Sequence, residues 1–184
     1  NILIANTFLP SNNSNLNYRQ LEFSWPQIPN SNNYEITIND INLDLSLLID
    51  SDDNILIYDG YNLEWGESYT WEVCGFSNNN LIECHEKKYF NINEIPIDQI
   101  PPILEIIHLN ENAIQDGITI LSGGFYPSIP YSIGIDNYGE ILWYLNPYRV
   151  SKILNNGNFL SHFEPTAWEI TKEGEIIFQT PESD

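Results

Sequence analysis

The chain has 184 residues, of which 42% are hydrophobic and 13% aromatic, so it can bury one large core or two small ones and is not globally disordered. It carries 26 acidic residues against 6 basic ones, a formal net charge of -20. Because nucleic acids and anionic membrane surfaces bind basic patches, neither is an expected partner. No apolar run approaches the ~20 residues of a membrane helix, so we expect no membrane insertion.

The chain opens at Asn1 on a strand-like apolar stretch and continues into a polar segment over 11–17 that reads as a flexible linker. We interpret this opening as a processed N-terminus or as the start of a cloned fragment. Residues 1–17 therefore form an arm with two alternatives. It is either the first strand of the domain that follows or a donor strand that adds to the open edge of a neighbouring subunit.

Residues 18–93 alternate large apolar and polar side chains, the period of strands with one face in a core. Turn-forming residues lie between the runs. The pattern predicts an antiparallel β-sandwich in an all-β chain. The expected strands cover 20–26, 33–39, 43–49, 54–59, 68–76 and 82–92.

This stretch resembles a fibronectin type III domain. The likeness is carried by Trp25, by Tyr34, and by a corner in which Leu63, Gly66 and Tyr69 lead into the next strand. Sandwiches of this kind are usually spacers or binding modules, and the resemblance implies the same here.

Two cysteines, Cys74 and Cys84, flank an Asn-rich turn. Folding a hairpin about this turn places them opposite each other on the outer face, where they can form a cross-strand disulfide. The alternative is two free thiols. A disulfide would indicate an oxidising location, so the chain is expected to be secreted, periplasmic or at the cell surface.

The loop after residue 49 spaces Asp50, Asp52 and Asn54 at alternate positions, as calcium loops begin. The glycine and glutamate of a helix–loop–helix calcium site do not follow. We therefore predict either a calcium site in a sandwich loop, with calcium as the candidate cofactor, or a solvated acidic turn.

A proline-rich linker is predicted over 94–102, because three prolines within seven residues exclude a helix or a central strand. The segment 103–184 follows as a second antiparallel β region of repeated hairpins. Its clearest repeat places the pattern of 135–143 again at 170–178, 35 positions later. Hairpins at a fixed period of this size are typical of propeller blades or solenoids.

The second region resembles the first blades of a bacterial arylsulfotransferase-type β-propeller. The matching runs lie at 116–121, 134–144, 154–160 and 168–176. The resemblance implies a partial propeller-like fold and, for a larger parent enzyme, aryl-sulfate sulfotransfer. The segment 147–152, where that family carries its histidine pair, contains no histidine. No catalytic residue is therefore assigned in this chain.

The second region has one basic neighbourhood, Arg149 and Lys152 with His162, which could contact a sulfate or a carboxylate or could neutralise nearby acids. Together these observations favour a secreted, non-catalytic interaction or assembly module, with protein partners or self-association. Exchanged strands and calcium are the expected means of assembly. The first alternative is the N-terminal fragment of a propeller enzyme whose catalytic blades lie beyond residue 184. A weaker one is a carbohydrate-binding sandwich that uses Tyr58, Tyr61 or Trp65.

Overall fold

The structure is a computed structural model that describes residues 7–42, 46–96, 117–122, 132–163 and 166–181. The chain divides into two compact units, Asn1–Glu94 and Ile95–Asp184, and each is described by itself. Every regular element in the described ranges is a β-strand, which confirms the predicted all-β class. Among these residues, no helix has the length and apolar character that crossing a lipid bilayer requires.

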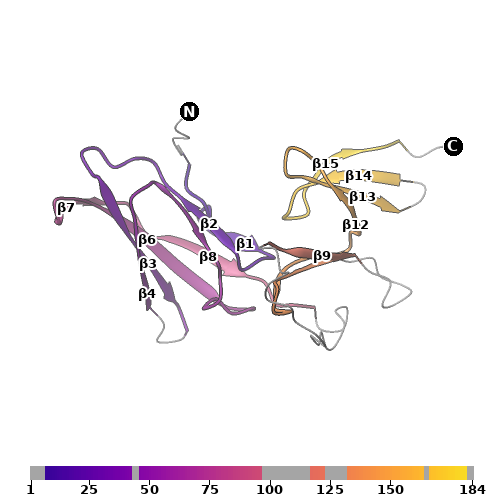
Figure 1. Ribbon diagram of the computed structural model, residues 1–184, viewed down its shortest axis with the longest axis horizontal. Coiled ribbons are helices and arrows are strands. Elements are labelled where there is room, and N and C mark those ends of the chain that lie inside the picture. The colour runs from indigo at the N-terminus through magenta and orange to yellow at the C-terminus, as the bar shows by residue number, and fades with distance from the viewer. Residues whose placement is uncertain (1–6, 43–45, 97–116, 123–131, 164–165, 182–184) are drawn as a thin grey trace. The chain divides into compact units, whose positions relative to one another are not determined.

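The first unit contains eight strands in two sheets (Figure 1). One sheet has six strands in the order β1-β8-β6-β3-β4, with β7 paired to β6, and the other contains β2 and β5. The strands are β1 Ser14–Leu16, β2 Leu21–Ser24, β3 Asn33–Asp40, β4 Ser46–Ser51, β5 Ile55–Tyr58, β6 Ser68–Ser77, β7 Asn80–Cys84 and β8 Lys88–Ile92.

This strand order is that of a fibronectin type III-like sandwich. Leu9 bridges Ser24 through two backbone hydrogen bonds and so borders the β2–β5 sheet. The chain then crosses to the other sheet, where β1 runs parallel to β8. The predicted flexible linker over 11–17 therefore contains a strand. Leu16 holds it in place, because its side chain is buried and its carbonyl accepts a hydrogen bond from Asn93 N.

Alternating apolar side chains of both sheets form the core. Along β3 buried and half-buried residues alternate without interruption, as the sequence period predicts. Three aromatic pairs dominate the packing, with ring centroids 5.2–5.3 Å apart. They are Phe23 with Trp71, Trp25 with Tyr34, and Tyr69 with Phe90.

Tyr69 fixes the corner that leads into β6. Its hydroxyl accepts a hydrogen bond from Glu64 N at 2.7 Å, and Leu63, six residues before it, is fully buried. Gly66 adopts a φ of 84°, a backbone conformation that residues other than glycine rarely adopt. Burial is the main cause that raises the pKa of Tyr69 to about 12. These contacts form the tyrosine corner of immunoglobulin-like sandwiches.

The single strand predicted over 82–92 is wrong, because the structure has two strands there. β7 pairs with the end of β6 and β8 pairs with its beginning. His85 N still donates to Val73 O, and its ring nitrogen lies 2.9 Å from Pro26 O. The chain thus leaves the edge of β6 after residue 85 and returns to it at residue 88.

The second unit contains two antiparallel meanders. Three strands form the first, β9 Thr119–Ser122, β10 Ser132–Ile135 and β11 Ile141–Leu145, in the order β11-β10-β9. Four strands form the second in chain order: β12 Val150–Ile153, β13 Phe159–Phe163, β14 Thr166–Ile170 and β15 Ile176–Gln179. Most of the predicted linker 94–102 lies outside the described residues.

The sequence repeat corresponds to one repeated loop. In the β10–β11 loop, Asp136 Oδ1 accepts hydrogen bonds from Tyr138 N and Glu140 N. In the β14–β15 loop, Thr171 Oγ1 accepts the equivalent pair from Glu173 N and Glu175 N. The glycines that close the two loops have φ values of 85° and 90°. Both hairpins therefore use a glycine in the left-handed region, as the sequence predicts.

Candidate functional site

The described part of the sandwich carries a polar groove of about 460 Å³. The groove lies at one end of the sheet, beside the start of β3, the end of β4 and the hairpin between β6 and β7. Three carboxylates, three other polar side chains and one aromatic ring line it: Glu35, Asp50, Asp52, Asn33, Ser51, Asn79 and Phe76.

Strand register brings these residues together. Glu35 on β3 lies directly opposite Asp50 on β4, and Asn33 lies opposite Phe76 on β6. Ser51 shapes the turn that presents Asp52, because its hydroxyl donates to Asp53 O at 2.8 Å and accepts from Asp53 N at 3.2 Å. The groove is therefore built on paired strands and one hydrogen-bonded turn.

The groove is strongly acidic and its charges are not neutralised within the described residues. Like charges directly opposite each other on neighbouring strands repel, and Glu35 with Asp50 is such a pair. Neither residue, nor Asp52, forms an ion pair with a cation in the described ranges. A cationic ligand would relieve this repulsion.

The three residues predicted to bind calcium are only partly assembled. Asp50 and Asp52 line the groove, whereas the side-chain amide of Asn54 donates to Trp25 O at 2.8 Å and ties β5 to the neighbouring chain segment. Among the described residues, one His/Cys/Asp/Glu trio has its ligand atoms within 4.8 Å of one another, Glu72 with Cys74 and Cys84. The two cysteines form a disulfide, so that trio lacks the thiolates that a metal would need.

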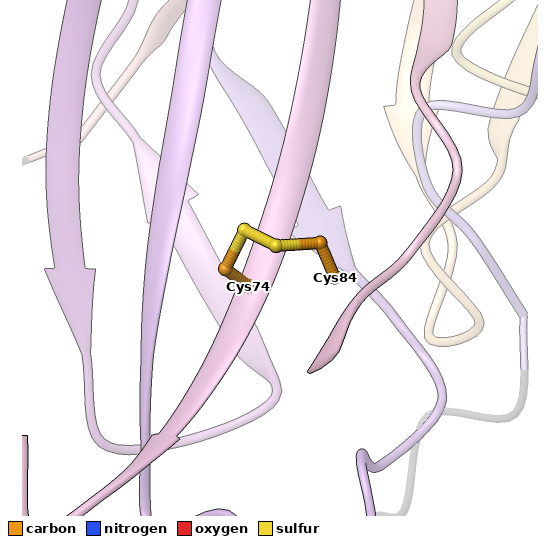
Figure 2. The surroundings of a disulfide bond; sticks show 2 residues. All are labelled: Cys74 and Cys84. Atoms are coloured by element: carbon orange, nitrogen blue, oxygen red, sulfur yellow. A yellow bond between two sulfur atoms is a disulfide. The ribbon is translucent and has the colours of Figure 1, made fainter. Parts of the chain in front are cut away.

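The disulfide between Cys74 and Cys84 joins β6 to β7 (Figure 2). The two residues are direct cross-strand partners, with Cα atoms 4.0 Å apart. Asn78 and Asn79 both have positive φ values, which closes the two-residue turn between these strands. The alternation on β6 leaves Cys74 half-buried on the face opposite to Trp71 and Val73.

The aromatic residues considered for carbohydrate binding have partners within the sandwich. The Arg19 guanidinium lies 5.6 Å from the ring centroid of Trp65. Tyr58 accepts a hydrogen bond from Asn62 through its hydroxyl. These contacts give Trp65 and Tyr58 a packing role.

The predicted basic neighbourhood lies on the second meander. Lys152 is opposite Leu160, and His162 is two residues further along β13, so both lie on one face of the sheet. Arg149 immediately precedes β12, and all three basic residues are exposed.

The same face carries Glu169, opposite Leu160. Hydrogen bonds from the side chains of Asn158 and Asn156 lower the pKa of Glu169, and both lie in the preceding hairpin loop. This face therefore carries the basic residues Lys152 and His162 together with Glu169, whose ionised form is stabilised by the two amides of the loop.

Sequence reasoning missed part of the groove. Glu35, Phe76 and Asn79 come from strands and a turn that are distant in sequence from Asp50, and they meet it only through the pairing of β4 with β3 and of β3 with β6. Glu35 was visible as an outward-facing residue of an alternating strand. Its cross-strand partner depends on register, which the sequence alone does not give.

No protein-family model matches the chain. A search of curated proteins also found no match. Among solved structures, the chain is similar to the FN1–FN3 domains of chicken CNTN1, with 10% sequence identity and a TM-score of 0.40. The match covers 92% of this chain and 61% of that chain. The fold assignment rests on the strand order, the core and the tyrosine corner described above.

Proposed function

We propose that the chain is an extracellular interaction module and that the acidic groove of its sandwich binds a basic segment of a protein partner. The observation that carries the proposal is the position of Glu35, Asp50 and Asp52 around one groove without a cation among the described residues. The module is non-catalytic in this proposal, and the hydroxyl of the groove residue Ser51 is hydrogen-bonded to the backbone of Asp53.

The lining of the groove suits an arginine or lysine side chain. Carboxylates accept charge-assisted hydrogen bonds from a guanidinium or an ammonium group. Phe76 is half-buried at the same groove and offers a ring face for a cation–π contact. Asn33 and Asn79 add amide groups that can bind the partner's backbone.

The disulfide between Cys74 and Cys84 supports an extracellular or periplasmic location, because such bonds persist in oxidising compartments. Calcium remains a proposal of its own at the same groove. Asp50, Asp52 and Glu35 would have to move closer together to supply part of its six to eight oxygen ligands, because these three carboxylates do not form a trio within 4.8 Å of one another. The partner would complete the shell. In that case calcium would assist assembly by bridging two acidic surfaces.

The test is binding of a lysine- and arginine-rich decapeptide to the purified chain, measured by calorimetry with EDTA and with added calcium. We expect the triple variant Glu35→Gln, Asp50→Asn, Asp52→Asn to bind at least about tenfold more weakly. The control variant Glu64→Gln, Glu83→Gln, Glu86→Gln removes the same charge from exposed positions outside the groove. Equal weakening in both variants would show that only net charge matters and would refute the groove. Binding that requires calcium would assign the groove to the metal.

A second candidate function is the N-terminal part of an arylsulfotransferase-like propeller enzyme. The observation that favours it is the pair of antiparallel meanders with a repeated loop, since propeller blades are four-stranded meanders. This candidate predicts that the parent gene encodes further hairpins of the same repeat and that its full product turns over an aryl sulfate. A parent protein without such hairpins would exclude it.

A further inference from the structure

The two meanders of the second unit have equivalent faces. Across the first meander, the pairing places Ile120 beside Gly134 and Gly134 beside Trp143. Across the second, it places Leu160 beside Glu169 and Glu169 beside Phe178. Gly134 and Glu169, like Trp143 and Phe178, are 35 positions apart, which is the period of the repeat.

In the first meander this face is covered by the second meander. Trp143 is only 6% exposed, its ring centroid lies 5.1 Å from that of Phe159, and its indole nitrogen donates to Lys172 O at 2.9 Å. The hydroxyl of Ser122 donates to Val150 O at 2.6 Å, where β12 begins. An aromatic contact and hydrogen bonds to the backbone thus join one meander to the next.

The equivalent face of the second meander is open among the described residues. Phe178 stands at the position of Trp143 and is 57% exposed. Ile176 and Ile177 are also exposed, although the alternation along the strand places Ile177 on the opposite face, and β15 is an edge strand of its sheet. Exposed apolar residues on an unpaired edge strand mark a surface that associates with another β element.

We propose, as a refinement of the second candidate function, that this surface binds a third β-meander of the same repeat. We call it the Phe178 face, and it is formed by Lys152, Leu160, His162, Ala167, Glu169 and Phe178. We infer the occupant from the existing interface, because the equivalent face of the first meander is covered by the second meander. The third meander would bring an aromatic residue at the position of Phe159 against Phe178. Because the side chain of Phe178 has no N–H group, the hydrogen bond from Trp143 to Lys172 O has no counterpart at this face.

One residue sets a chemical requirement on this occupant. Glu169 stands where the first meander has Gly134, and an added Cβ at Gly134 would lie 2.8 Å from Ile118 and 3.3 Å from Trp143. The first meander's own side chains therefore leave no room for a side chain at that position, whereas the second meander carries a carboxylate there that is held by Asn156 and Asn158. We expect the third meander to offer a hydrogen-bond donor or a cation to Glu169 in place of an apolar group.

The test extends the full chain with a second copy of its own meander. The spacing between repeats fixes the junction, because Val150 plus one period of 35 gives position 185. A copy of residues 150–181 is therefore fused directly after Asp184. We expect amide hydrogen exchange of β15 to slow at least about tenfold in the extended chain. The substitution Phe178→Ser should remove that protection, while changing exchange in the unextended chain by less than about twofold.

The control substitution is Ile57→Ser, an equally exposed apolar residue of the sandwich, which should leave β15 protection unchanged. An extension that gives β15 no protection, or protection that survives Phe178→Ser, would overturn the proposal. Light scattering of the unextended chain distinguishes the other occupant. If that chain forms a dimer that Phe178→Ser dissociates, a second copy covers the face and the proposed occupant is wrong. The groove of the sandwich takes no part in this experiment. If the groove did not bind the basic peptide, the result for the Phe178 face would still hold.

Discussion

The two units of the chain are both built of antiparallel strands, but they differ in how completely they cover their apolar residues. In the sandwich, two sheets face each other and share one core in which fourteen apolar side chains are buried. In the second unit, seven apolar side chains are buried among the described residues, and β15 is exposed along its whole length. The seven are Ile133, Leu142, Trp143, Leu145, Val150, Phe159 and Ile170. A sandwich thus covers its core with its own two sheets, whereas the first meander is covered by the second one and the second leaves β15 exposed.

The largest expected effect separates the two units directly. Phe23→Ala removes a fully buried ring from the sandwich core and should lower the free energy of unfolding of that unit by about 3–5 kcal/mol. Phe178→Ala removes a ring of the same size from an exposed strand and should change stability by less than about 0.5 kcal/mol. Denaturant unfolding of both variants checks this. A large loss for Phe178→Ala would mean that β15 is covered in solution.

Removal of the disulfide should have the next largest effect, and only in the sandwich. The bond closes a segment with a sequence separation of 10, for which chain entropy predicts a stabilisation of about 2–3 kcal/mol. In thermal unfolding, the double variant Cys74→Ser, Cys84→Ser should have a free energy of unfolding that is lower by this amount. Hydrogen exchange in β13 and β14 should remain unchanged, and a change there would show that the effect of the bond is not confined to the sandwich.

Tyr69→Phe should cost about 1 kcal/mol at neutral pH, because Glu64 N loses its hydrogen-bond acceptor. It should also change how the free energy of unfolding of the sandwich depends on pH in the alkaline range. Burial raises the pKa of Tyr69 from 10.0 to about 12, so an unfolded chain ionises this tyrosine first. The resulting stability is present below pH 10 and is lost as the pH rises toward 12. In the phenylalanine variant this part of the alkaline decline should disappear, as urea unfolding at several pH values will show.

The smallest expected effect concerns the second unit at acid pH. Hydrogen bonds from Asn158 and Asn156 lower the pKa of Glu169 below its usual 4.5. Its contribution to stability is therefore present above pH 4.5 and is lost as the pH falls through the lowered pKa. We expect the double variant Asn156→Ala, Asn158→Ala to return this pKa toward 4.5 in a carboxyl NMR titration. An unchanged pKa would show that these amides do not hold the carboxylate.

Much of the fold could be predicted because its signals are local. The alternation around Phe23, Ile36 and Trp71 indicates which side chains face the core, and these residues are buried. The glycine at 139 and its repeat at 174 predict the hairpins that the structure contains. The division of 80–92 into two strands was missed, because the apolar pattern does not tell where the chain leaves one edge and returns to it.

The candidate groove was harder to predict than the fold. Asp50 and Asp52 attract attention because they lie at alternate positions of one loop, but Glu35 and Phe76 join them only through the register of three strands. Asn54 has the spacing of a ligand, yet its amide is used to hold Trp25 O. Sequence spacing identifies loop ligands, whereas a groove across strands depends on pairing.

The parallel pairing of β1 with β8 has a consequence for a module held at both ends. These two strands lie near the beginning and the end of the sandwich, and backbone hydrogen bonds join them, including Asn13 N to Tyr89 O and Asn93 N to Leu16 O. Tension applied to the two ends would pull parallel neighbours in opposite directions along their length. All these bonds would then be loaded in shear at the same moment instead of opening one by one like a zipper. The sandwich should therefore resist stretching better than its three-residue strand would suggest.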